Sequence, residues 1–316
     1  MLFYIISALI NAVVSTILGV VVYFKNRKEF TNKIFAVFCF VVAVWSYSYF
    51  VWLLLKDKSV VLINHRIFLM GASIFIVILF FHSVLSFTNK VKNYKKFLIS
   101  GYSIFSFFLL VDYFTPFFIK NVERELIFEF WPKPGIFLHP FLIIWYFYLL
   151  FAIYILVKEI KGSYDNISYN AQLKYILAGT IIGFGGAALN YFLWYGIQIP
   201  PITNFLVSVG MITIAFGIVK HHLFNIKILT SELLVFISWF FVIVRSALSQ
   251  NTQELWANIV LMLLMFVIGT FLIRSVSREV ASEKKLLEEA QKNLEFEKKL
   301  HQALAEVSEK RAKIKF

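Results

Sequence analysis

The chain has 316 residues, of which 60% are apolar, 19% are aromatic and only 16% are charged. A typical soluble domain carries about 25% charged residues, so this composition excludes an ordinary soluble protein and indicates a polytopic membrane protein. The net charge of +13 predicts topology and not nucleic-acid binding, because lysines and arginines concentrate in short loops between apolar segments.

Nine apolar segments approach the length of about 20 residues that a membrane-spanning helix needs. In chain order, the predicted spans are 2–24, 34–55, 67–88, 97–119, 138–157, 174–196, 202–219, 228–248 and 255–273. The first has no preceding basic residue and no small-residue cleavage site, so it is predicted to be retained as a helix. Pro116 is predicted to kink or end the fourth. The eighth contains Glu232 and Arg245, so a re-entrant hairpin by the last two segments stays an alternative.

Basic residues gather in alternate loops. Loops 25–33 and 89–96 hold four each, and loops 158–174 and 220–227 hold three and two. The loops between them are balanced in charge or carry few basic residues. Since basic loops stay on the cytoplasmic side, the pattern predicts an outer N-terminus and a cytoplasmic C-terminus. Seven or nine crossings give the same placement.

The C-terminal segment 274–316 contains no glycine or proline and is rich in lysine, glutamate, alanine and leucine. These residues favour a helix that continues from the last span. An interrupted apolar stripe, surrounded by mixed charges, predicts a parallel dimeric coiled coil and therefore a homodimer. A solvated helix and a helix packed on a partner protein are the alternatives. The stripe is formed by Val276, Val280, Leu287, Ala290, Leu294 and Leu304.

Polar side chains inside membrane spans are costly, so each is a candidate functional residue. On the predicted topology, several fall in the outer half of the bundle, where we expect a ligand pocket with aromatic walls. The alternative is structural, because asparagine and histidine bond between packed helices and tryptophan forms interfacial belts. The candidate ligand-binding residues are Asp112, Asn190, Trp194, Asn204, Trp145, Trp52 and His139.

Two further patterns concern packing and chemistry. Gly179, Gly183 and Ala187 recur at four-residue spacing, which lets helices approach closely. The adjacent His221 and His222 do not give two metal ligands on one helix face, and neither a phosphate-binding loop nor a nucleophile motif occurs. We therefore expect no metal, no cofactor and no enzymatic activity from this chain.

The stretch 170–230 resembles the last two sensor helices of bacterial seven-transmembrane histidine kinases. The matching features are Gln172 and Tyr175, the glycines, Asn190, the Pro200–Pro201 outer loop and "GIVKHHLFNIKI" at 217–228. The segments "AVWSYSYFVW" at 43–52 and "FFHSVLSF" at 80–87 are similar to the second and third helices of the family. "IRSVSREVASEKKLLEEAQKNL", which follows the last hairpin, is similar to its signalling helix.

The resemblance implies a bacterial cytoplasmic-membrane protein of three parts: a seven-helix sensor bundle at 1–227, a transmembrane hairpin at 228–273 and a cytoplasmic signalling helix at 274–316. His301 lacks the Arg-Thr-Pro that follows the family's phosphoacceptor histidine, so we expect sensor and linker without a kinase. The kinase would lie in a longer chain or in a separate cytoplasmic protein. The candidate signal-coupling residues are His221, His222, Leu223, Phe224, Asn225, Val280, Leu287 and Leu294.

These observations favour a sensory membrane module, an all-α bundle that detects a signal in its outer half and passes it through a dimeric cytoplasmic helix. Two alternatives remain open. One is a membrane scaffold whose tail recruits a cytoplasmic partner. The other is a transporter with Asp112, His82 and Asn190 along its path. The bilayer is a partner in every case, and nucleic acid in none.

Overall fold

The computed structural model describes residues 1–218 and 258–280, with the isolated residues 231, 235, 239, 242, 253, 256, 282, 286 and 289. The chain divides into two compact units, Met1–Phe224 and Asn225–Phe316. Most of the predicted eighth span lies outside the described residues. So do the predicted coupling residues His221, His222, Leu223, Phe224, Asn225, Leu287 and Leu294, together with His301.

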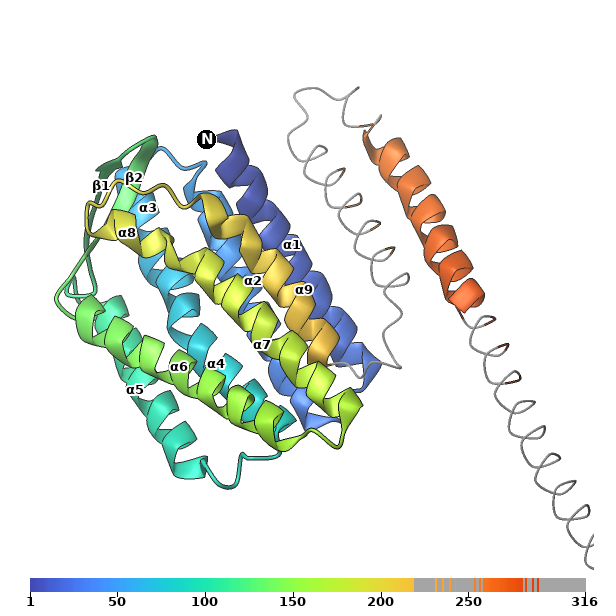
Figure 1. Cartoon of the computed structure of the whole chain (residues 1–316). Coiled ribbons are helices and arrows are strands. Elements are labelled where there is room, and N and C mark those ends of the chain that lie inside the picture. Colours follow the sequence, from blue (N-terminus) through green and yellow to red (C-terminus); the bar gives the residue numbers. More distant parts are fainter. Residues whose placement is uncertain are drawn as a thin grey trace, which may run out of the picture. The chain divides into compact units, whose positions relative to one another are not determined.

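The first unit is a helix bundle with a small β-hairpin at one end (Figure 1). Its helices are α1 (Leu2–Lys25), α2 (Phe30–Trp52), α3 (Lys58–Asn64), η1 (His65–Met70), α4 (Gly71–Phe87), α5 (Lys95–Phe114), α6 (Leu138–Gly162), α7 (Ile167–Ala188), α8 (Asn190–Trp194), η2 (Ile202–Phe205) and α9 (Leu206–Ile218). The antiparallel strands β1 (Ile119–Glu125) and β2 (Phe128–Pro134) lie between α5 and α6. We call the end with the strands, α3 and α8 the hairpin end.

Seven helices in the described part of the chain are long and apolar enough to cross a membrane. Six belong to the first unit, where α3, η1 and α4 form one continuous span and α7 and α8 form another. The seventh, Asn258–Val280, belongs to the second unit, and the helix Ile202–Ile218 is apolar but shorter. Large apolar side chains such as Ile143, Phe147 and Leu150 of α6 are exposed, as suits a lipid-facing surface. The protein is an integral membrane protein.

Among the span boundaries that differ from the sequence prediction, two have a clear local cause. The fourth span was predicted to reach residue 119, but α5 ends at Phe114, because Pro116 lacks the N–H that would continue a helix. The chain then enters the β-hairpin, where the sequence analysis placed only a loop. The third span begins at Lys58 and not at residue 67, because the Asp57 side chain accepts hydrogen bonds from two backbone N–H groups of the first turn.

Helices α7 and α9 approach each other through glycines. A Cβ atom at Gly210 would lie 2.4 Å from the Gly183 Cα atom and 2.7 Å from the Gly179 carbonyl oxygen. A Cβ atom at Gly179 would lie 2.7 Å from the Gly210 carbonyl oxygen. The predicted close packing at Gly179 and Gly183 is therefore confirmed. Gly185, two residues after Gly183 and therefore on another face of α7, is exposed and has nothing within 4 Å of such an atom.

The second unit is described mainly by its apolar helix, Asn258–Val280. The Trp239 indole packs on this helix: its ring stacks on Phe266 with centroids 4.8 Å apart, and its Nε1 donates to the Met265 carbonyl oxygen at 2.8 Å. A hairpin over 228–273 accounts for these contacts but stays a prediction. The coiled coil beyond Val280 also stays a prediction.

An ionic cluster ties the two strands to the loop before α9. The Glu125 carboxylate pairs with Lys133 across the hairpin, and Gln198 Nε2 donates to its Oε2 atom at 2.7 Å. The hydrogen bond from Lys133 is the main cause that lowers the pKa of Glu125, with a further contribution from Gln198. The charged carboxylate therefore holds strand β1, strand β2 and residue 198 together.

Acidification is expected to loosen this cluster. Because the folded-state pKa of Glu125 is depressed, its stabilising effect is present above the unfolded-state pKa and is lost as pH falls through the folded-state value. The protection of residues 119–134 against hydrogen exchange, corrected for the intrinsic exchange rate at each pH, should fall between about pH 7 and about pH 3. The variant Glu125→Gln should lose most of this pH dependence. The exposed Glu123→Gln should retain it; equal profiles for the two variants would contradict the assignment.

Candidate functional site

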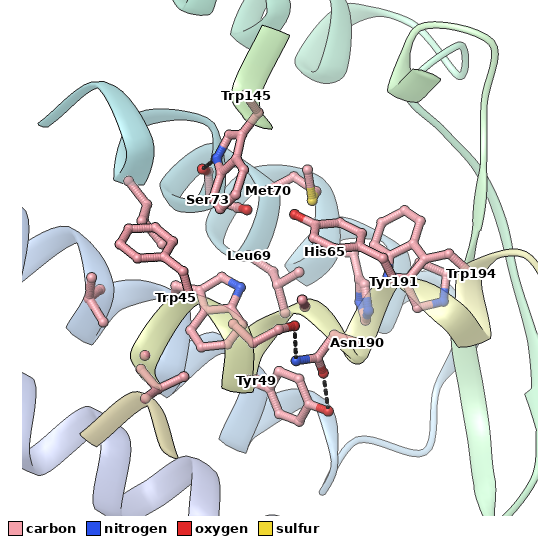
Figure 2. Close-up of a pocket in the computed structure, with 18 of the residues that line it drawn as sticks. Trp45, Tyr49, His65, Leu69, Met70, Ser73, Trp145, Asn190, Tyr191 and Trp194 are labelled. Carbon is pink, nitrogen blue, oxygen red and sulfur yellow. Dashed lines mark hydrogen bonds between the residues drawn. The ribbon is translucent and has the colours of Figure 1, made fainter. Parts of the chain in front are cut away.

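A pocket lies inside the first unit, between the helices and strand β2 (Figure 2). The cavity has a volume of about 80 Å³, which is room for several small groups. Side chains of α2, η1, α4, β2, α6, α7, α8 and α9 contribute to its wall. The largest are the tryptophan and tyrosine side chains of Trp45, Tyr49, Trp52, Trp131, Trp145, Tyr146, Tyr191 and Trp194.

Helix α2 presents one face to the pocket. Its lining residues are Phe38, Val42, Trp45, Tyr49 and Trp52, spaced by three or four residues. This spacing places side chains on the same side of an α-helix. A single helical stripe therefore builds the longest wall of the pocket, from the middle of α2 to its last residue.

The π-helical turn η1 supplies the only histidine among the described lining residues. His65 is fully buried, and its Nδ1 atom lies 2.9 Å from the Val61 carbonyl oxygen. A carbonyl oxygen only accepts, so Nδ1 carries a proton, and in the neutral imidazole Nε2 is an acceptor. Nε2 is buried and has no hydrogen-bond partner among the described residues. Single π turns inside α-helices are frequent at functional sites.

Trp52 joins the β-hairpin to the helices. Its Nε1 donates to the Phe130 carbonyl oxygen at 2.6 Å, and its ring centroid lies 4.5 Å from His65, 4.7 Å from Tyr49 and 4.9 Å from Trp131. Trp131 itself is 1% exposed, and its indole Nε1 has no hydrogen-bond partner among the described residues. Trp131 of the hairpin therefore packs over the pocket, in an aromatic cluster centred on Trp52 of α2.

Asn190 connects the pocket wall to a polar network. The Tyr49 hydroxyl donates to Asn190 Oδ1 at 2.9 Å, and Asn190 Nδ2 donates to the Ala187 carbonyl oxygen at 2.9 Å and to Asn204 Oδ1 at 3.2 Å. Figure 2 shows Asn190 with its bonds to Tyr49 and to the backbone of α7. The Asn190 amide thus bonds within the protein on both its oxygen and its nitrogen.

The network continues to α1 and α9. Asn11 Nδ2 donates to the Asn204 carbonyl oxygen at 2.8 Å, and Asn11 Oδ1 accepts from the Ser208 backbone N–H at 3.0 Å. These bonds tie the first helix of the bundle to its last. Asn11 and Asn204 are fully or almost fully buried, so the bonds satisfy polar groups that lipid could not.

The comparisons with known proteins agree with this architecture. The model of the family described as the N-terminal 7TM region of histidine kinase matches residues 7–227. The chain belongs to this family. The match covers α2 to α9 and all of the pocket, and it is to the membrane sensor region of histidine kinases, not to a catalytic kinase domain. Searches of curated proteins and of solved structures gave no significant match.

Within this seven-transmembrane region, four of the predicted ligand-binding residues line the pocket, namely Trp52, Trp145, Asn190 and Trp194. Trp145 Nε1 donates to the Ser73 carbonyl oxygen at 3.3 Å, which fixes its indole against α4. The assignment of these four to ligand binding stays a prediction. The structure adds the observation that these four residues line one cavity.

The other three predicted residues do not line the pocket. Asp112 is fully buried on α5, and neither carboxylate oxygen has a hydrogen-bond partner among the described residues. His139 lies at the start of α6, where its Nδ1 is 2.9 Å from the exposed Tyr195 hydroxyl. Asn204 takes part in the network between α1 and α8. For His139 and Asn204 these contacts match the structural alternative.

Sequence reasoning missed most of the residues that line the pocket, and two of these, His65 and Trp131, lie outside the predicted spans. Both fell in segments that the sequence analysis treated as loops, 56–66 and 120–137. Their one available signal was residue type: a histidine at the edge of a span and a tryptophan in an otherwise charged loop. Neither pattern distinguishes a pocket residue from a surface residue.

Proposed function

We propose that the seven-transmembrane region detects a small molecule in the pocket and transmits its binding to the C-terminal cytoplasmic helix. The observation that carries this proposal is the contribution of α9 to the pocket wall, through Val207, Met211 and Ile214. Helix α9 is described as far as Ile218, and the remaining part of the chain follows it. A ligand that favours one packing of α9 on α7 therefore acts on the connection to the output.

The orientation of the sensor follows from its charged ends. Loops at the end opposite the hairpin, 25–33, 89–96 and 158–174, carry most of the basic residues between the spans of the bundle. The positive-inside rule then places that end in the cytoplasm and the hairpin end outside. The pocket would face a signal from outside the cell, and residues 274–316 would extend into the cytoplasm of a bacterium.

The output would be a homodimer. A parallel coiled coil over 274–316 would convert a small shift of the membrane helices into a rotation or register change, which are known forms of two-state transition. Its receiver would be a histidine kinase domain or another cytoplasmic output protein. The family membership supports a kinase, since the matched region is the N-terminal part of such proteins.

A cysteine crosslinking scan in membranes tests this proposal. Single cysteines are placed across 276–304 in a Cys39→Ala background, and disulfide formation is measured at each position. We expect crosslinks to recur at intervals of three and four residues, because a parallel coiled coil repeats its contacts every seven residues. A scan without such periodicity would refute the dimeric output.

Pocket-filling variants then connect the scan to the pocket. Ala187→Trp places a large side chain in the pocket wall, and we expect it to change the relative crosslinking of neighbouring positions. The matched control is Gly185→Trp, which adds the same side chain to an exposed position of α7. A periodic pattern that neither variant changes would refute the pocket as the sensing site.

The transport alternative gains no support from the described residues. It requires Asp112, His82 and Asn190 along one path, but Asp112 and His82 do not line the pocket. His82 Nδ1 lies 3.0 Å from the Tyr102 hydroxyl, on the side of α4 that meets α5. No described contact favours the scaffold alternative either.

A further inference from the structure

The chemistry of the pocket wall restricts the charge of its ligand. No lysine, arginine, aspartate or glutamate occurs among the described lining residues. His65 is the titratable imidazole in the wall, but its Nδ1 atom lies against the Val61 carbonyl oxygen and its Nε2 atom has almost no accessible surface. A buried ion without an opposite charge is strongly disfavoured, because it loses its hydration without replacement. The wall therefore favours an uncharged ligand.

Four polar side chains of the wall already hydrogen-bond within the protein. Tyr49 donates to Asn190, and the Asn190 amide donates its two hydrogens to Ala187 and Asn204. The indole N–H groups of Trp52 and Trp145 donate to backbone carbonyl oxygens. Every N–H and O–H hydrogen of these four side chains is therefore engaged. A ligand that accepted a hydrogen bond from one of them would have to displace a bond that the protein makes.

Aromatic rings and aliphatic groups supply most of the contact surface. The tryptophan and tyrosine rings of the wall are joined by Phe38 and Phe184, and α9 adds aliphatic side chains and Met211. Rings of the wall pack edge to face on one another: the Trp45 and Tyr49 centroids are 5.7 Å apart, at an interplanar angle of 61°. Such surfaces bind apolar groups by burial of area and by ring contacts, neither of which needs a polar group on the ligand.

The volume of the cavity sets an upper limit on the size of the ligand. It is about 80 Å³. For comparison, an engineered apolar cavity of about 150 Å³ holds one benzene molecule. The pocket therefore admits at most one small ring or a branched group of similar size. The acyl chain of a membrane lipid is too large to enter it completely.

We propose that the pocket binds a small, uncharged, apolar molecule no larger than one ring, held by contact with the aromatic wall and not by charge or hydrogen bonds. This inference rests on the proposed function of the pocket as the sensing site, and it adds the chemical class of the signal. The affinity of such a ligand depends on the area that it buries. The packing of α9, which lines the pocket through Val207, Met211 and Ile214, therefore affects how tightly the ligand is held.

Fluorine NMR titration of the full chain in lipid nanodiscs tests the inference with matched probes. Fluorobenzene is apolar, and 3-fluoropyridine has the same ring size but carries a hydrogen-bond acceptor and is uncharged at neutral pH. Empty nanodiscs give the background of partition into lipid, and affinities refer to the free aqueous concentration. We expect saturable binding of fluorobenzene that is about tenfold tighter than that of 3-fluoropyridine, because the ring nitrogen loses its hydrogen bond to water. The cation tetramethylammonium should not displace fluorobenzene.

Two pairs of variants assign the binding to the pocket. Met211→Gln places an amide in the wall, so it should reduce the preference for fluorobenzene to about threefold or less. The control Thr213→Gln places the same amide on α9 outside the pocket and should retain the preference. Ala187→Trp should abolish saturable binding of fluorobenzene, and the exposed Gly185→Trp should retain it. Circular dichroism confirms folding, and the second pair keeps the test decisive if Met211→Gln fails to fold.

The outcomes separate this inference from the proposed function. Equal or tighter binding of 3-fluoropyridine, displacement by tetramethylammonium, or a preference that Met211→Gln retains in full would overturn the apolar assignment. Absence of saturable fluorobenzene binding would overturn it as well. The proposed function is judged separately, by whether Ala187→Trp changes the crosslinking pattern of the C-terminal segment. A changed pattern without fluorobenzene binding would leave the pocket as a sensing site for a ligand of another class.

Discussion

Gly210→Leu is expected to destabilise the sensor bundle by about 3 kcal/mol or more, because it forces apart α7 and α9. A Cβ atom at this position would lie 2.4 Å from Gly183 Cα and 2.7 Å from the Gly179 carbonyl oxygen. Both neighbours are backbone atoms, which no side-chain rotation can move away. The clash therefore requires a displacement of one whole helix.

Thermal unfolding in detergent, followed by circular dichroism, measures this effect. The matched control is Gly185→Leu, because Gly185 is exposed on α7 and has nothing within 4 Å of an added Cβ atom. Both substitutions replace glycine with a better helix former, so their difference isolates the helix contact. We expect Gly185→Leu to unfold at or above the temperature of the unmodified chain. Equal unfolding temperatures for the two variants would refute the close contact.

The same displacement should reach the pocket. Val207, Met211 and Ile214 of α9 line it, and Gly183, which contacts Gly210, lies in the adjacent wall on α7. Any residual folded population of Gly210→Leu is therefore expected to have an altered pocket. On the proposed function, structural and functional effects would coincide at α9, because the helix packs on α7 and precedes the proposed output.

Local patterns predicted the spans and the glycine contact. A run of about 20 apolar residues has few alternatives to a membrane helix, so α1, α2 and α6 were predicted close to their observed bounds. The spacing of Gly179 and Gly183 is also local, because small residues four apart form one face of a helix. Each of these signals lies within a single segment of sequence.

Long-range geometry explains what the sequence did not predict. Asn11 bonds to the Asn204 carbonyl oxygen across 193 residues of sequence, so its structural role could not be read from either segment. Asp112 was assigned to the pocket by depth, but depth does not fix which way a helix faces. Helix α5 is apolar around much of its circumference, and it places Asp112 outside the pocket wall.

The pocket residues His65 and Trp131 lie on two local irregularities. The π turn of η1 carries His65, and a β-hairpin carries Trp131. Neither irregularity has a clear hydropathy signal, since a π turn keeps the apolar run and a short hairpin contains charged residues. Four pocket-lining residues were therefore predicted from residue type and depth, and His65 and Trp131 were found only in the structure.

Trp52→Ala is expected to separate the hairpin from the helices and to destabilise the bundle by about 3 to 5 kcal/mol. Trp52 is 4% exposed, and its ring lies within 5 Å, centroid to centroid, of His65, Tyr49 and Trp131. Its removal opens a cavity and leaves the Phe130 carbonyl oxygen without the indole donor. We expect faster hydrogen exchange at 128–134.

Two variants divide this effect into its parts. Trp52→Phe retains an aromatic ring but loses the bond to Phe130, so it should cost about 0.5 to 1.5 kcal/mol. Trp45→Ala removes a tryptophan from the pocket wall that has no ring contact with the hairpin among the described residues, so exchange at 128–134 should stay unchanged. If Trp52→Ala also leaves exchange unchanged, Glu125 and its partners hold the hairpin and Trp52 does not. If exchange rises only in Trp52→Ala, the tryptophan that lines the pocket also keeps it covered.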